Sequence, residues 1–132
     1  MNYNSVTTVY ELDLSTAFDI STATYNSNNY DTTAETANAQ GVTFNPGETI
    51  MYVIDSTENV FQYTLSTAGD ITSASYASKT LDASSQVSIG NGLDFSDSGF
   101  TLNIIDSATN VETYTLTTAY DLSTASCSSR ML

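Results

Sequence analysis

The chain has 132 residues, of which 15 are acidic and two are basic, and none is His, so its net charge is −13. Nucleic acid and anionic membranes repel such a chain, and the absence of His excludes Ser-His-Asp and Cys-His catalysis and any His metal ligand. One Cys forbids an internal disulfide, the first residues lack a signal-peptide pattern, and no apolar run approaches the ~18 residues of a membrane helix. These features predict a soluble, non-enzymatic protein without nucleic-acid or membrane partners.

The chain is organised by an internal repeat of 51 residues. Residues 9–23, 60–74 and 111–125 match without gaps, and 41–44 and 51–56 match 92–95 and 102–107 in the same register. A gapless period of this length is typical of repeat architectures. The single repeat domain 1–132 therefore divides into a half repeat (5–40), a full repeat (41–91) and a full repeat that ends in its last strand (92–132).

In chain order, the half repeat predicts two strands and each full repeat predicts four. The first full repeat has strands at 42–44, 50–55, around 61–65 and around 74–82, and the second has its first two at 93–95 and 101–106. Turn signals such as Asn45-Pro-Gly-Glu48 separate them. Tyr76 and Leu81 lie an odd number of residues apart, so we expect a bulge in the last strand. The sequence therefore predicts an all-β fold of about ten antiparallel strands.

Alternation within the third strand of each repeat predicts which side chains form the core. Apolar and polar residues alternate there, so we expect the aromatic positions to be buried and the intervening Glu11 and Asp13 to face water. Cys127 stands where the other repeats have Tyr, and is predicted to be a small buried hydrophobe. The predicted core aromatics are Tyr10, Phe61, Tyr63 and Tyr114.

The residues also carry a family resemblance. Phe44-Asn-Pro-Gly, Met51-Tyr-Val, Val60-Phe-Gln-Tyr-Thr-Leu-Ser-Thr-Ala and Asp70-Ile resemble the propeller-type β-repeats of marine bacteriophage and bacterial surface proteins. The resemblance covers residues 5–132 and implies β-propeller-blade-like repeats. The chain departs from the family pattern at the Pro-Trp pair, which is replaced by Ala17-Phe18, Ala68-Gly69 and Ala119-Tyr120.

Two and a half repeats cannot close a ring of about four to eight blades. We therefore expect an incomplete ring whose half repeat presents an open edge, and such edges recruit partners. This predicts a homo-oligomer, possibly a trimer of open arcs. A compact ten-stranded sandwich is the alternative.

Few residues stand out as candidate site residues. Asp19, Asp70 and Asp121 recur between the last two strands and are predicted to accept backbone N–H groups in Asx turns. Asp94 and Asp97 flank Phe95 and are weak candidates for calcium, so we expect no cofactor apart from a weak possibility of that ion. Phe18 and Tyr120 occupy loops and are the candidates for surface contact. We expect no catalytic residues.

The predicted function is that of a structural protein of a virus particle, a phage capsid decoration or appendage component on the virion surface. Its expected partners are further copies of itself and a capsid or tail protein. The alternative is a carbohydrate-binding, lectin-like module that recognises a cell-surface glycan through Phe18, Tyr120 and nearby polar residues, with avidity from its repeats.

Overall fold

The computed structural model describes residues 7–107 and 110–131, with the side chains of 129–131 excepted. The fold is all-β: ten antiparallel strands form three sheets, and no closed barrel is present in the described part of the chain. This confirms the predicted all-β class and the predicted number of strands. The N-terminal sheet has β1 (Thr8–Leu14) and β2 (Ala23–Asp31); the central sheet has β3 (Ala39–Phe44), β4 (Ile50–Asp55), β5 (Asn59–Leu65) and β6 (Ala74–Asp82); the C-terminal sheet has β7 (Gly90–Ser96), β8 (Thr101–Asp106), β9 (Val111–Leu116) and β10 (Ala125–Met131).

The strand pairing follows the 51-residue spacing of the sequence. In the central sheet Gly41 pairs with Ile54, and in the C-terminal sheet Gly92 pairs with Ile105. Between β5 and β6 the register shifts after the Tyr63–Tyr76 pair. The shift confirms the predicted bulge. Tyr76 and Leu81 pack in the two different apolar layers, on opposite faces of the central sheet.

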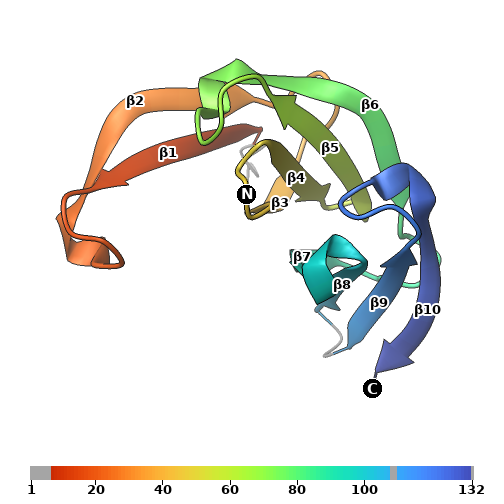
Figure 1. Cartoon of the computed structure of the whole chain (residues 1–132). Coiled ribbons are helices and arrows are strands. Elements are labelled where there is room, and N and C mark those ends of the chain that lie inside the picture. Colours follow the sequence, from red (N-terminus) through yellow and green to blue (C-terminus); the bar gives the residue numbers. More distant parts are fainter. Residues whose placement is uncertain (1–6, 108–109, 132) are drawn as a thin grey trace.

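The three sheets stand side by side in an arch with the central sheet in the middle (Figure 1). The N-terminal sheet forms one arm and the C-terminal sheet forms the other. The innermost strands of the two larger sheets, β3 and β7, lie next to each other. The two outer sheets therefore border the open side of the arch.

The core consists of two apolar layers, one on each face of the central sheet. Tyr52, Ile54 and Val60 pack against the C-terminal sheet, while Met51 and Val53 face the N-terminal sheet. Residues 51–55 are all buried because both faces of β4 are covered. Each fully buried large apolar side chain contributes about 1.5–3 kcal/mol. The burial of three predicted core aromatics is confirmed: Phe61, Tyr63 and Tyr114.

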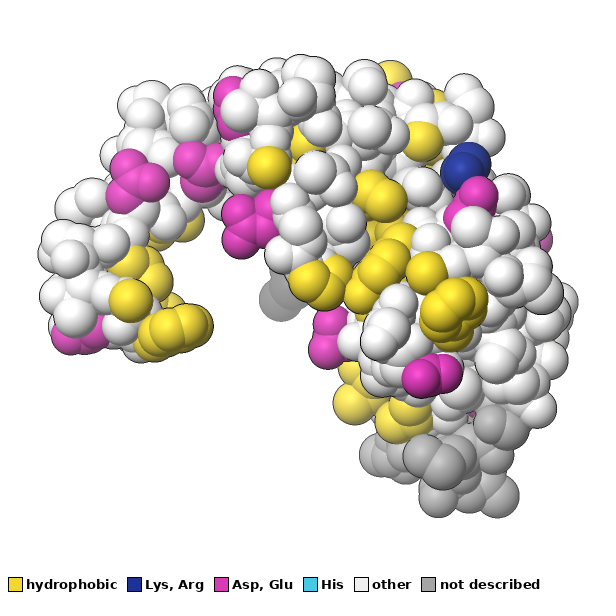
Figure 2. All heavy atoms as spheres, in the orientation of Figure 1, with side chains coloured by type: hydrophobic (Ala, Val, Ile, Leu, Met, Phe, Trp, Pro, Cys, Tyr) yellow, Lys and Arg dark blue, Asp and Glu magenta, His cyan; other side chains and the backbone are white. Residues whose placement is uncertain are grey.

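The N-terminal sheet departs from the predicted pattern. Tyr10 is 59% exposed, so its predicted burial is wrong, and Glu11 is partly buried rather than turned to water. The cause is the orientation of β1: the side that carries Val9 and Glu11 faces the central sheet, and the opposite side is open. Figure 2 shows hydrophobic side chains gathered near the free end of this arm.

Cys127 also differs from its prediction. Its thiol is exposed, not buried. It lies on β10, the edge strand of the C-terminal sheet, and an edge strand at the outer rim offers little cover to a side chain as small as Cys.

A search of the described residues for membrane-crossing helices, which need length and apolar character together, finds none.

Candidate interaction sites

The three links that precede the last strand of each sheet share one local structure. Each contains a short 3-10 turn: η1 (Ile20–Thr22), η2 (Ile71–Ser73) and η4 (Leu122–Thr124). The aspartate before each turn accepts a backbone N–H two residues later, at 3.0, 2.9 and 3.0 Å for Asp19, Asp70 and Asp121. Hydrogen bonds from the hydroxyl and the backbone of Ser21 lower the pKa of Asp19. The predicted Asx role of these residues is confirmed.

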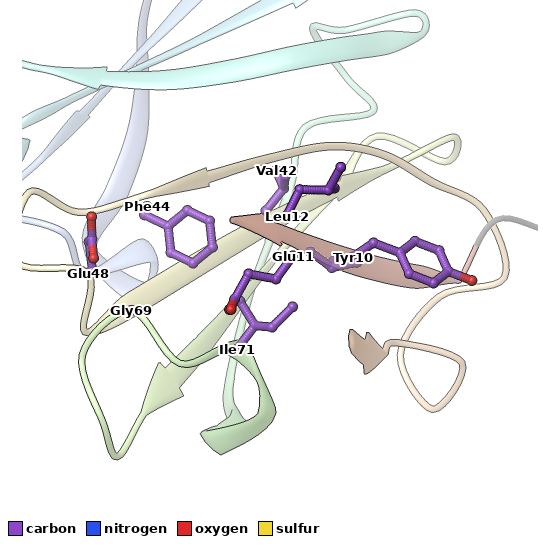
Figure 3. Close-up of a pocket in the computed structure, with 9 residues that line it drawn as sticks. Tyr10, Glu11, Leu12, Val42, Phe44, Glu48, Gly69 and Ile71 are labelled. Atoms are coloured by element: carbon purple, nitrogen blue, oxygen red, sulfur yellow. The ribbon is translucent and has the colours of Figure 1, made fainter. Parts of the chain in front are cut away.

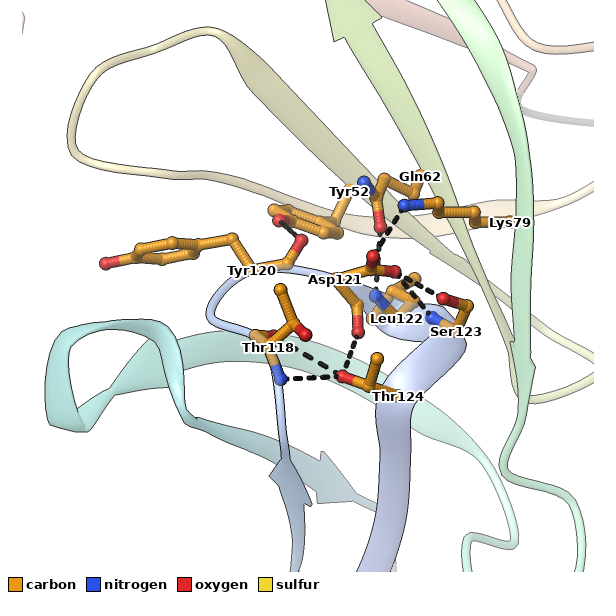
Figure 4. Close-up of polar contacts among 9 residues, drawn as sticks. All are labelled: Tyr52, Gln62, Lys79, Thr118, Tyr120, Asp121, Leu122, Ser123 and Thr124. Atoms are coloured by element: carbon orange, nitrogen blue, oxygen red, sulfur yellow. Dashed lines mark hydrogen bonds and ion pairs between the residues drawn. The ribbon is translucent and has the colours of Figure 1, made fainter.

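The link of the C-terminal sheet is docked against the central sheet (Figure 4). The Tyr52 hydroxyl donates to the backbone oxygen of Tyr120 at 2.6 Å, and the Leu122 N–H donates to Oε1 of Gln62 at 3.0 Å. Lys79 Nζ lies 2.8 Å from Oδ2 of Asp121. The hydrogen bond from Lys79, followed by that from Ser123, holds the pKa of Asp121 below its usual value. These contacts fix the relative position of the two larger sheets.

Phe18 and Tyr120 occupy equivalent loop positions but have different surroundings. Both have a left-handed backbone, with φ of 63° and 62°. Phe18 is fully exposed. The ring of Tyr120 packs 5.3 Å from that of Phe95 and fills the space beside Gly99. The structure therefore leaves the side chain of Phe18 open to solvent and packs that of Tyr120 within the fold.

The weak calcium candidates lie at the inner edge of the C-terminal sheet. Asp94 is on β7, where it accepts a hydrogen bond from the Thr43 hydroxyl at 3.3 Å. Asp97 begins the 3-10 turn η3 (Asp97–Gly99) that follows the strand. Among the described residues no group of three or more acidic, Cys or His side chains is placed to hold a metal ion.

A groove runs between β1 and the central sheet (Figure 3). In the central sheet, β5 has β4 on one side and β6 on the other, whereas β1 is paired, among the described residues, with β2 only. The groove, with a volume of about 320 Å³, lies beside the free edge of β1. It is lined by Val9, Tyr10, Glu11, Leu12, Val42, Phe44, Glu48, Gly69 and Ile71.

The open side of the N-terminal sheet forms a continuous apolar surface, which we call the N-terminal face. The rings of Tyr10 and Tyr25 meet edge to face, with centroids 5.7 Å apart. The members of the face and their exposed fractions are Tyr10 (59%), Leu12 (53%), Leu14 (43%), Ile20 (86%) and Tyr25 (51%). Exposed apolar patches of this kind mark contact sites. Alternation in the sequence predicts that Tyr10, Leu12 and Leu14 share one side of β1, but it does not reveal that this side is uncovered.

Comparison of the chain with known protein families, with characterised proteins and with solved structures finds no match.

Proposed function

We propose that this chain is a non-enzymatic structural protein of a virus particle, a bacteriophage capsid decoration or appendage component that acts through self-assembly and protein–protein contacts. In this proposal the three sheets are blade-like units of an incomplete propeller. The observation that carries it is the N-terminal face, a surface of large apolar side chains at one end of the arch. Soluble proteins seldom leave such a surface open unless another molecule covers it.

Two further features support an assembly role. The free edge of β1 exposes backbone groups that can pair with another strand, as open sheet edges do. The chain carries 19 Ser and 22 Thr with a net charge of −13, so its remaining surface is hydrated and keeps copies apart until a specific contact forms. The resemblance of its repeats to those of marine bacteriophage proteins supports the viral setting.

The test is the protein content of purified particles. Virus particles banded by density from the producing culture should contain this chain in many copies when analysed by quantitative mass spectrometry. Its absence from the particles, with the chain present in the unbanded lysate, would contradict the proposal.

A glycan-binding role is the second candidate, and Phe18 is the observation that favours it. A fully exposed aromatic ring next to the hydrogen-bonded Asp19 and Ser21 offers a flat apolar surface beside polar groups, which is how proteins bind sugar rings. A glycan array probed with the wild type and with Phe18→Ala, with and without calcium, separates the two roles. Binding that is lost in the variant supports glycan recognition, and a blank array contradicts it.

A further inference from the structure

We infer that the N-terminal face of one copy docks on the outer side of the C-terminal sheet of a second copy, head to tail, and that two copies close a ring. This inference deepens the proposed assembly role and rests on it, because both require the uncovered faces to be protein contact surfaces. The inference commits to a second copy of this chain because the chain already contains the same contact twice.

The first internal contact lies between the N-terminal and central sheets. Val9 and Tyr30 cover one side of the central sheet, and the ring of Tyr30 meets that of Tyr63 at 5.3 Å. The residues that they cover, with their exposed fractions, are Met51 (0%), Val53 (0%), Phe61 (8%), Tyr63 (0%), Leu65 (4%) and Ile71 (3%).

The second internal contact joins the central and C-terminal sheets in the same way. The covering residues are Tyr52, Ile54 and Val60, on the other side of the central sheet. The residues that they cover in the C-terminal sheet lie 51 positions after those covered in the first contact. These are Leu102, Ile104, Tyr114, Leu116 and Leu122, each 4% exposed or less. Every sheet that has a predecessor in the chain thus has these positions buried.

The N-terminal face carries four of these positions in the first sheet, and no sheet covers them in the described part of the chain. Subtracting 51 from the buried Phe61, Tyr63, Leu65 and Ile71 gives Tyr10, Leu12, Leu14 and Ile20, and subtracting it from the partly buried Tyr76 gives Tyr25. The exposed Tyr10, Leu12, Leu14 and Ile20 match the buried Phe61, Tyr63, Leu65 and Ile71 in apolar character. The exposed set therefore has the shape and chemistry to receive the outer side of another sheet.

The C-terminal sheet presents the matching outer side, which we call the C-terminal face. It carries Asn103, Ile105 and Val111 at the positions of Tyr52, Ile54 and Val60. Ile105 is 51% exposed, whereas Ile54 is fully buried. These residues line a surface groove of about 320 Å³. In the first internal contact Val9 and Tyr30 pack on the apolar side, and Glu11 lines the adjoining groove.

The Asn103 amide of the C-terminal face tolerates being covered. Asn103 accepts a hydrogen bond from the Thr113 hydroxyl at 3.1 Å and donates one to Ser96 at 3.0 Å. Its amide therefore keeps both partners when another sheet covers the face, and the contact avoids the cost of a buried unpaired amide.

The pairing register of the last strand differs between the central and C-terminal sheets. Arg130 follows Lys79 by 51 residues, but the bulge in β10 is one residue shorter than that in β6. The backbone register therefore sets Arg130 opposite Glu112, whereas Lys79 lies opposite Gln62. The contact between copies rests on apolar packing, so we expect it to strengthen at about 0.5 M salt, where the repulsion between two −13 chains is screened.

Geometry favours two copies. The two uncovered faces belong to the outer sheets, which border the open side of the arch (Figure 1). A contact between different surfaces makes a ring when its rotation closes. Two copies supply six sheets, within the range of about four to eight seen in closed propellers, and three copies supply nine.

The test combines mass with directed cross-linking. At micromolar concentration, light scattering should give about twice the 14.1 kDa of one chain. Ile20 has the same place in the repeat as Leu122, and Thr113 has the same place as Gln62. Leu122 and Gln62 are joined across the second internal contact by a 3.0 Å hydrogen bond. In a Cys127→Ser background, a mixture of Ile20→Cys and Thr113→Cys chains should therefore form a disulfide-linked pair on oxidation, while Ile20→Cys alone should not.

A matched pair of surface variants checks that the face carries the contact. Leu12→Ser should weaken association about tenfold or more, which corresponds to ~1.4 kcal/mol. Phe100→Ser removes a side chain of similar exposure, 42% against 53%, at the turn before β8, outside both faces, and should leave the association constant unchanged. Circular dichroism of both variants shows whether each remains folded.

Several outcomes would overturn the inference. A mass of one chain at all concentrations, a mass of three chains, or self-linking of Ile20→Cys, which indicates that two N-terminal faces meet, each contradicts it. The proposed function fails separately. A monomer found in purified particles refutes the ring alone, and a cross-linked dimer absent from particles refutes the virion role alone.

Discussion

The hydrogen bond between Tyr52 and the link of the C-terminal sheet should make a measurable contribution to stability. Tyr52 is fully buried, and its hydroxyl donates to the Tyr120 carbonyl at 2.6 Å. Tyr52→Phe keeps the ring, which packs 4.5 Å from that of Phe95, so it creates no large cavity. The variant loses one hydrogen bond and leaves a shielded carbonyl without that donor, which costs about 1–2 kcal/mol.

Urea unfolding, followed by circular dichroism at one fixed protein concentration, measures the loss. With a slope of about 2 kcal/mol per molar urea, a loss of ~1.5 kcal/mol lowers the midpoint by roughly 0.7 M. Tyr76→Phe is the matched control, because its hydroxyl makes an equally short 2.6 Å hydrogen bond with Thr80 in an exposed position. Water replaces that partner, so the control should lose less than about 0.5 kcal/mol. Equal losses in the two variants would refute the reasoning that burial gives the Tyr52 bond its value.

The pH dependence gives an independent check. Burial, followed by the nearby Tyr120 and Asp121, raises the pKa of Tyr52 well above its ordinary value. A group whose pKa is raised in the folded state stabilises the fold below its unfolded pKa of about 10, and this contribution is lost as the pH rises above that value. Burial also raises the pKa of Tyr114, to about 12. In an absorbance titration, these tyrosines should ionise at a higher pH than exposed tyrosines. The difference in unfolding free energy between the wild type and Tyr52→Phe should become smaller above pH ~10, because only the wild type loses the contribution of Tyr52.

Two further variants probe the links. Gly99→Ala should destabilise the fold by about 2 kcal/mol in a thermal melt, because Gly99 has φ of +91° and a Cβ there would lie 2.3 Å from the ring of Tyr120. The control Gly47→Ala should be near neutral, because its Cβ would meet nothing closer than 3.7 Å. Similar losses in the two variants would contradict the steric argument. Lys79→Met should cost about 0.5–1 kcal/mol at pH 7, because Asp121 loses a partly exposed ion pair. The pKa of Asp121 is lowered in the folded state, so this stabilisation is present above the unfolded value of about 3.9 and is lost as the pH falls through the lowered pKa. A difference that persists at pH 2 would show that Lys79 acts through packing rather than charge.

The sequence by itself determined the local structure of this protein. Alternation and turn residues gave strands whose bounds match the predictions closely, as at 50–55 and 74–82, because these signals depend on neighbours a few residues away. The recurring aspartates could be assigned to Asx turns for the same reason, since donor and acceptor are two residues apart.

Only the tertiary structure decided which sides of the strands are covered. Tyr10 and Phe61 occupy the same place in the repeat, yet one is 59% and the other 8% exposed, because in the described part of the chain a sheet covers that side of the central sheet and none covers that side of the N-terminal sheet. Phe18 and Tyr120 differ for a related reason, since Tyr120 has Phe95 beside it while Phe18 is surrounded by solvent. Whether a side chain is buried depends on segments that are distant in the chain and pack against it. The repeated sequence pattern is the same whether or not such a segment covers the strand.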